Sequence, residues 1–119
     1  MRNKWITIGA IFGFLGVAIG AFGAHSLKPL LTPESTEIFK TGVQYHLIHS
    51  LVILGIGFYD NQKYYLAGWF FSAGIILFSF SLYIYSLTNN ASFAIITPFG
   101  GVCFLTGWLV IIIYSLRKQ

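Results

Sequence analysis

Four apolar runs, each long enough to cross a bilayer, occupy most of this 119-residue chain. The hydrocarbon core of a membrane is about 30 Å thick, so a spanning helix needs roughly 20 apolar residues. The runs lie at about 5–24, 41–59, 65–87 and 93–114, and short polar segments join them. Because backbone groups in lipid must be hydrogen-bonded within the segment, each run is expected to be a helix. The sequence therefore predicts an all-α, integral membrane four-helix bundle that forms a single transmembrane domain over residues 1–119.

Composition supports this class of protein. The chain is 56% hydrophobic and only 8% charged, whereas a soluble domain carries about 25% charged residues. Its net charge of +4 is not gathered into a basic block, so membrane lipids are the expected partners and nucleic acid is not. The lone Cys103 lies within an apolar run and excludes an intrachain disulfide. The first run has the length of a span, so we expect an uncleaved helix rather than a signal peptide.

Charges at the ends of the runs predict the orientation. Four spans place both termini on one side of the membrane. That side carries Arg2, Lys4, Lys63, Arg117 and Lys118, and the other carries Lys28 and Lys40. By the positive-inside rule, both termini are expected to face the cytoplasm. Aromatic residues are expected to form an interfacial belt on that side: Trp5, Tyr59, Tyr64, Tyr65, Trp69, Trp108 and Tyr114.

The segment between the first two runs contains a clear helix start. After a polar joint at 25–31, Thr32-Pro33-Glu34 combines a hydroxyl N-cap, a proline at the first helical position and an acid in the first turn. This pattern predicts a helix from Pro33 to about Tyr59. Its first turns would lie at the headgroup level, where Lys28, Glu34, Glu37 and Lys40 set helix depth or touch lipid headgroups or a partner.

Glycines predict where helices approach closely. Five of them in the first run are spaced four, three, four and three, which places all five on one helix face: Gly9, Gly13, Gly16, Gly20 and Gly23. Small residues allow close packing in lipid, so this face is expected to meet another helix of the chain or, alternatively, a second copy in a homo-oligomer. Gly100 and Gly101 predict a second such surface. Pro98 is expected in the first turns of the fourth helix, where its missing N–H costs little.

Polar side chains inside the runs are the candidate site. His46 and His49 lie three residues apart on one face, and His49 lies about 12 Å deeper than Thr41. Ionisable groups within a membrane are functional candidates. We expect a polar pocket around His49, open to the outside, that binds a ligand or relays protons. Its candidate residues come from all four runs or their ends: His25, Tyr45, His46, His49, Ser79, Ser81, Tyr83 and Thr97.

Three interpretations of the histidines remain open. In the first, each neutral imidazole hydrogen-bonds to a neighbour and fixes how the helices pack. In the second, His25, His46 and His49 ligate zinc, copper or haem iron, although no carboxylate or cysteine lies at a matching depth. In the third, histidines that titrate near neutral pH carry protons or bind an anionic headgroup or solute.

The sequence contains no recognised catalytic motif. The acids Glu34, Glu37 and Asp60 all lie at helix ends, so neither a buried acid pair nor a catalytic triad is expected. The sequence favours a non-enzymatic binding or accessory protein. The alternatives are a transporter or channel that acts as an oligomer and, less favoured, a metal- or haem-dependent membrane enzyme. The pattern leaves the ligand and any cofactor open.

Motifs in all four runs resemble one family. Gly20-Ala21-Phe22-Gly23-Ala24-His25 with Leu27 is similar to the first-helix signature of the small membrane proteins catalogued as "domain of unknown function 423", which have a eukaryotic relative, transmembrane protein 256. The other helices contribute Thr41-Gly42, Tyr45 and His49, then Leu77-Phe78-Ser79 and Ser81-Leu82-Tyr83, then Thr97-Pro98, Gly100-Gly101, Phe104-Leu105 and Gly107-Trp108. The resemblance implies a four-helix protein of the bacterial inner membrane without an established activity. His25 and His49 match its motif positions, whereas a relative has Gln in place of His46, which weakens a three-histidine metal site.

Overall fold

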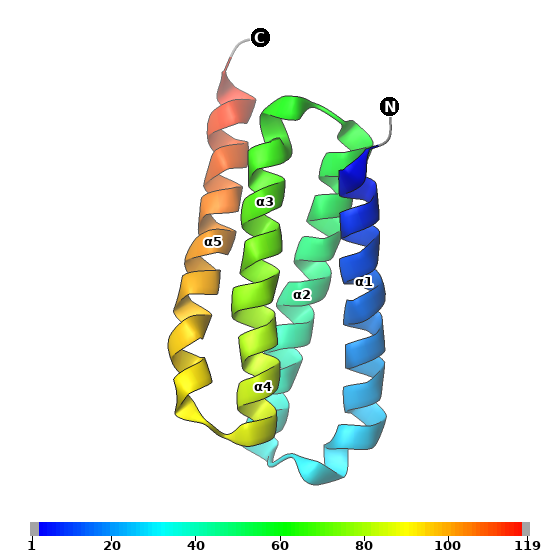
Figure 1. The fold of residues 1–119 in the computed structure, drawn as a ribbon, viewed down its shortest axis with the longest axis vertical. Coiled ribbons are helices and arrows are strands. Elements are labelled where there is room, and N and C mark those ends of the chain that lie inside the picture. Colours follow the sequence, from blue (N-terminus) through cyan, green and yellow to red (C-terminus); the bar gives the residue numbers. More distant parts are fainter. Residues whose placement is uncertain (1–2, 118–119) are drawn as a thin grey trace.

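The chain folds into long helices that run side by side (Figure 1). The computed structural model describes residues 3–117. Four helical segments are long and apolar enough to cross a membrane: Lys4–Leu30, Pro33–Tyr59, Gln62–Thr88 and Ala91–Leu116. No strand occurs within the described range. The expected all-α architecture with four spans is confirmed. Arg2 and Lys118, which entered the orientation argument, lie outside the described residues.

Two of the four segments change helix type along their length. The first comprises α1 (Lys4–Phe22), the π-helical turn η1 (Gly23–Leu27) and the 3-10 turn η2 (Lys28–Leu30), and the second is α2 (Pro33–Tyr59). The third comprises the 3-10 turn η3 (Gln62–Tyr64), α3 (Tyr65–Gly74), the π-helical turn η4 (Ile75–Ser79) and α4 (Phe80–Thr88), and the fourth is α5 (Ala91–Leu116). The joint expected at 25–31 is therefore helical through Leu30.

Local chemistry sets the helix ends. The Thr32 hydroxyl accepts a hydrogen bond from the Ser35 N–H at 3.0 Å, which confirms the helix start expected at Pro33. Asn90 caps α5 in the same way through Ser92. Asp60 and Asn89 end α2 and α4 in the left-handed region, with φ values of 55° and 56°. Asp and Asn tolerate this conformation better than other non-glycine residues, so the chain turns sharply there.

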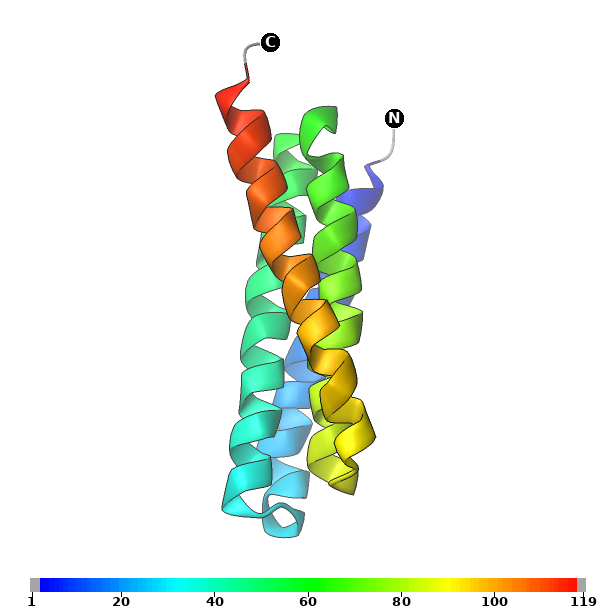
Figure 2. The same cartoon turned by 90° about the vertical axis from the view of Figure 1, so that its left-hand side faces the viewer.

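The helices form a narrow bundle with α1 and α5 at its edges. α1 packs mainly on α2, α2 also contacts α3 and α4, and α5 packs on α3, η4 and α4. Figures 1 and 2 show this order, with α5 tilted across α3 and α4 in the second view. The start of α1 and the end of α5 lie at the same end of the bundle (Figure 1). Much of the outer surface of both edge helices is apolar, as lipid-facing helices require.

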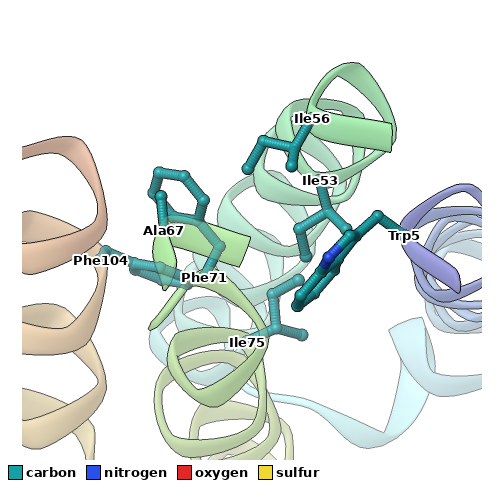
Figure 3. Close-up of a cluster of buried hydrophobic side chains, with 7 residues drawn as sticks. All are labelled: Trp5, Ile53, Ile56, Ala67, Phe71, Ile75 and Phe104. Carbon is teal, nitrogen blue, oxygen red and sulfur yellow. The ribbon is translucent and has the colours of Figure 1, made fainter. Parts of the chain in front are cut away.

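The core lies toward the end that holds the termini. Figure 3 shows its seven side chains: Trp5, Ile53, Ile56, Ala67, Phe71, Ile75 and Phe104. Trp5 is fully buried, so at this end of the bundle it packs between helices. The reason is a gap left by two glycines. A Cβ at Gly68 would lie 2.8 Å from the indole, and a Cβ at Gly57 would lie 3.0 Å from the Trp5 carbonyl carbon.

The glycine face of α1 lies against α2, with one exception. A Cβ at Gly9 would lie 2.7 Å from the Leu54 nitrogen, and one at Gly16 would lie 2.6 Å from the Leu47 side chain. Gly20 and Gly23 also approach α2, through Val43 and Phe39. A Cβ at Gly13, by contrast, would meet nothing within 4 Å. The two helices are therefore in close contact on either side of Gly13 and leave space at that residue.

Two features of α5 differ in detail from the sequence expectation. Gly100 and Gly101 are not equivalent, because Gly100 faces the backbone of η4 whereas a Cβ at Gly101 would come no closer than 3.9 Å to Phe78. Pro98 lies about two turns inside α5, since the helix already begins at Ala91, so it lies beyond the free N–H groups of the helix start. Its missing N–H therefore leaves the carbonyl of Ala94 without an intrahelical partner.

Candidate functional site

His46 connects three helices. The ring is fully buried. Its Nε2 lies 2.8 Å from the carbonyl oxygen of Phe12 on α1, and its Nδ1 lies 2.8 Å from the Tyr83 hydroxyl on α4. A carbonyl only accepts hydrogen bonds, so Nε2 carries the hydrogen and Nδ1 of the neutral ring accepts from Tyr83. Both nitrogens are thus used within the bundle.

His49 makes an equivalent connection between α2 and α5. Its Nδ1 donates to the Tyr45 carbonyl at 2.8 Å, and its Nε2 accepts from the indole N–H of Trp108 at 3.1 Å. A charged ring would place a second N–H against the indole N–H, so the arrangement fits only the neutral tautomer. The ring is 4% exposed and stacks on Phe104 with 3.8 Å between ring centroids. Neither histidine has a free lone pair for a ligand.

Of the other candidate residues, Tyr45 lies beside His49, with 6.1 Å between the two ring centroids, and the rest make contacts elsewhere. Ser81 and Thr97 form their own pair between α4 and α5, with 2.7 Å between the hydroxyl oxygens. Ser79 is fully buried, and its hydroxyl has no hydrogen-bond partner in the structure. Tyr45 is 41% exposed, and His25 is exposed at the end of the bundle away from the termini. The structure therefore shows separate interhelical contacts between the candidate residues.

Histidines do not assemble into a metal-ligand set. Among residues 3–117, no three His, Cys, Asp or Glu side chains come together as metal ligands would. His25, His46 and His49, proposed as a set from the sequence, are not brought together. The reason is that His25 lies in the exposed turn η1, whereas the other two face different neighbours inside the bundle.

Sequence reasoning missed the partner of His49. Trp108 was expected among interfacial aromatics, yet its indole donates to His49 and its ring packs on Phe71 at 5.2 Å between centroids. A signal was present in the sequence. Gly100, Phe104 and Trp108 recur every four residues and so lie on one helix face, which predicts that Trp108 faces inward beside the close-packing glycine.

Three hollows lie along α1. The largest, about 400 Å³, lies between α1 and α2 at the end of the bundle away from the termini. Its polar lining residues are Lys28, Thr36, Lys40 and Gln44, and its other lining residues are apolar or glycine. We call it the headgroup groove. The second, about 330 Å³, lies farther along the same two helices, and the third lies between α1 and α4. None of the three is lined by His46 or His49.

Charges at the headgroup groove are exposed and weakly paired. Lys40 Nζ lies 3.8 Å from a Glu37 carboxylate oxygen, and both side chains are more than two-thirds exposed. Such a pair contributes at most about 1 kcal/mol. It is the one ion pair within residues 3–117, so Lys28 is not part of any in that range. Both lysines are therefore available to a bound anion at little cost.

Comparison with known proteins decides the family. The model of the family described as "Protein of unknown function (DUF423)" matches residues 19–101. The chain belongs to the DUF423 family. It is 39% identical over 118 residues to the UPF0382 membrane protein YwdK of Bacillus subtilis, covering 95% of this chain and 96% of the relative. It is 36% identical over 124 residues to the UPF0382 inner membrane protein YgdD of Escherichia coli, covering 100% and 95%. No solved structure matches the chain at a significant level.

The family match confirms the resemblance seen in the sequence, and the names of the relatives agree with a membrane protein of four spanning helices. The DUF423 match includes His46, His49 and Tyr83 but ends before Trp108. Trp108, which lies on the fourth helix, falls only in the longer alignments with whole relatives.

A double-mutant cycle tests the bond between Trp108 and His49 in this DUF423 protein. Trp108→Phe keeps an aromatic ring against Phe71 and removes the N–H donor, and His49→Phe removes the acceptor. We expect a coupling free energy of about 0.6 to 1.7 kcal/mol, the usual range for interhelical hydrogen bonds in membranes. The measurement is unfolding by sodium dodecyl sulfate in mixed micelles. The same cycle with the half-exposed Trp69 in place of Trp108 should give no coupling. Zero coupling in both cycles would mean that the bond contributes nothing.

Proposed function

We propose that this DUF423 protein is a non-enzymatic binding protein that holds a phosphate-type anion, from a lipid headgroup or from solution, in the headgroup groove. The single observation that carries the proposal is that Lys28 and Lys40, from two different helical segments, line one groove. Lysine is a common phosphate ligand because its ammonium is a compact charge with three donors. The expectation of a binding protein is kept, and its site is moved from His49 to this groove.

The groove offers both polar and apolar contacts. Thr36 and Gln44 line it beside the lysines, and Val43 and Phe39 supply apolar surface. The stems of Lys28 and Lys40 can lie on this apolar surface while the ammonium groups stay in water. The carboxylates of Glu34 and Glu37 are not among the lining residues. A ligand with one anionic end and one apolar end fits this distribution better than a neutral polar solute.

The groove is proposed to open on the outer face of the cytoplasmic (inner) membrane, with both termini in the cytoplasm. Lys4, Lys63 and Arg117 lie at the end of the bundle that holds the termini, and the positive-inside rule places that end in the cytoplasm. The Escherichia coli relative is named an inner membrane protein. The groove then faces the headgroups of the outer leaflet.

The two alternatives receive less support. A transporter or metal-dependent enzyme centred on the histidines would need ring nitrogens free to bind or exchange, whereas both rings are fully hydrogen-bonded within the bundle. A homo-oligomer remains compatible with the apolar outer surface of α1 and α5, and the groove does not require one.

Replacing both lysines tests the proposal. We expect the wild-type protein, purified in detergent, to bind dioleoyl phosphatidylglycerol about tenfold more tightly than dioleoyl phosphatidylcholine, as measured by native mass spectrometry. The double variant Lys28→Gln/Lys40→Gln should lose this preference, because each lysine contributes about 1 kcal/mol at an anionic surface. Lys63→Gln, at the opposite end of the bundle, is the matched control and should keep it. Equal binding of both lipids by the wild type, together with no binding of inorganic phosphate, would refute the proposal.

A further inference from the structure

The second hollow lies next to the headgroup groove along the same pair of helices. It is lined by α1 residues between Gly9 and Val17 and by α2 residues between Leu47 and Leu54, and its volume is about 330 Å³. We call it the chain slot. Its lining is apolar except for Ser50, whose hydroxyl already donates to the His46 carbonyl at 2.7 Å. With its polar group occupied, the slot suits hydrocarbon.

Residue spacing shows that the two hollows lie on the same side of the α1–α2 contact. On α2, the lining residues Lys40, Gln44, Leu47, Leu51 and Leu54 follow one another at steps of four or three. Steps of this kind keep residues on one helix face. The third hollow lies on the other side, where Tyr83 and Leu87 of α4 line it. The headgroup groove and the chain slot therefore follow each other end to end along one face.

The slot is open at one glycine, Gly13, which lies between two close contacts of α1 with α2. A Cβ at Gly9 or Gly16 would collide with α2, whereas a Cβ at Gly13 would have nothing within 4 Å. Gly13 itself lines the slot. A side chain placed at this position would thus enter the slot without displacing either helix, which makes Gly13 a clean position for a test.

Length identifies what the slot can hold. The rise of 1.5 Å per residue places Leu54 about 21 Å from Lys40 along α2. One leaflet comprises about 15 Å of hydrocarbon and roughly 6 Å of headgroup. A lipid whose phosphate lies at Lys40 therefore extends an acyl chain just through the slot. A free anion would leave the slot without an occupant.

We infer that the ligand of the headgroup groove is a phospholipid of the adjoining leaflet, with one acyl chain in the chain slot beside Gly13. This inference rests on the proposed function for the anionic end and adds the class of ligand. The phosphate meets Lys28 and Lys40, and the chain lies between α1 and α2 along the face that Gln44, Leu47 and Leu51 share. The protein then selects its ligand by charge at one end and by chain length at the other.

Filling the slot tests the inference. Dioleoyl and dihexanoyl phosphatidylglycerol share a headgroup and differ in chain length. By native mass spectrometry, the wild type should bind the long-chain lipid about fivefold more tightly, which corresponds to about 1 kcal/mol. Gly13→Phe should remove this difference and keep the short-chain affinity. Gly13→Leu, with a smaller side chain, should reduce the difference partly. The matched control is Gly55→Phe, because a Cβ at Gly55 also meets nothing within 4 Å and Gly55 does not line the slot.

The outcomes separate the slot from the headgroup groove. Gly13→Phe could keep the difference in affinity between the long-chain and short-chain lipids while Lys28→Gln/Lys40→Gln still loses the preference for phosphatidylglycerol. In that case the acyl chain does not bind in the slot, and the proposed function stands. If inorganic phosphate displaces the long-chain lipid from the wild type as readily as the short-chain lipid, the ligand is an anion alone and the inference is overturned. If Gly55→Phe removes the difference as well, the effect does not come from the slot. If the wild type shows no preference for phosphatidylglycerol over phosphatidylcholine and does not bind inorganic phosphate, the proposed function is contradicted.

Discussion

Gly100→Leu is expected to lower the free energy of unfolding by at least about 3 kcal/mol, because it forces a side chain into the backbone of η4. A Cβ at Gly100 would lie 2.6 Å from Phe78 Cβ and 2.7 Å from the carbonyl carbon of Leu77. Backbone atoms cannot rotate away as the end of a side chain can. α5 and η4 would have to move apart, which would break the contact of Phe104 with Phe78.

Gly101→Leu is the matched control for this substitution. It changes the next residue to the same side chain, where the nearest atom to a Cβ is Phe78 Cδ1 at 3.9 Å. We expect a loss of less than about 0.5 kcal/mol, because the new Cβ makes only an ordinary contact there. Both variants would be unfolded with sodium dodecyl sulfate in mixed micelles, with helicity followed by circular dichroism. Similar losses for the two variants would show that α5 does not pack on η4 through Gly100.

His46→Leu is expected to have the next largest effect, a loss of about 2 to 3 kcal/mol. The substitution keeps an apolar side chain of similar length and removes the bonds to the Phe12 carbonyl and the Tyr83 hydroxyl. Each of these groups would then be buried without a partner, at a cost of about 1 kcal/mol or more. The loss should appear in the same unfolding measurement, since three helices depend on one ring.

A second substitution shows how much of this loss comes from the unpaired Tyr83 hydroxyl and how much from poor packing of the leucine. Tyr83→Phe in the His46→Leu background removes the hydroxyl that lost its partner, so we expect about 1 kcal/mol of stability to return. His46→Gln should be milder than His46→Leu, because an amide offers both a donor and an acceptor. His25→Leu is the control at an exposed position and should change little. If His46→Leu is as stable as the wild type, the ring does not hold the helices together.

These two predictions concern stability, whereas the lysine and Gly13 variants concern binding. The structure separates the two groups in space. His46 and His49 lie within the bundle and contact its helices, and Lys28 and Lys40 line a groove at its end. Variants of one group should therefore leave the property of the other unchanged.

Much of the fold could be predicted from the sequence because its determinants are local or follow from the solvent. The lengths of the apolar runs determined four spanning helices, since the bilayer requires about 20 residues per span. Thr32 and Pro33 determined the start of α2 through capping chemistry within a few residues. The motifs around Gly20, Thr41, Ser79 and Gly100 were sufficient to indicate the DUF423 family.

Tertiary structure alone decided which side chains meet. The sequence placed His46 and His49 on one helix face, but their partners Tyr83 and Trp108 come from helices 37 and 59 residues away. Which groups meet across such distances depends on the rotation and depth of each helix, and η4 alters both within the third span. The same holds for Gly13. Its spacing matched that of the other four glycines, and only the tertiary packing of α1 on α2 shows that Gly13 faces an open slot.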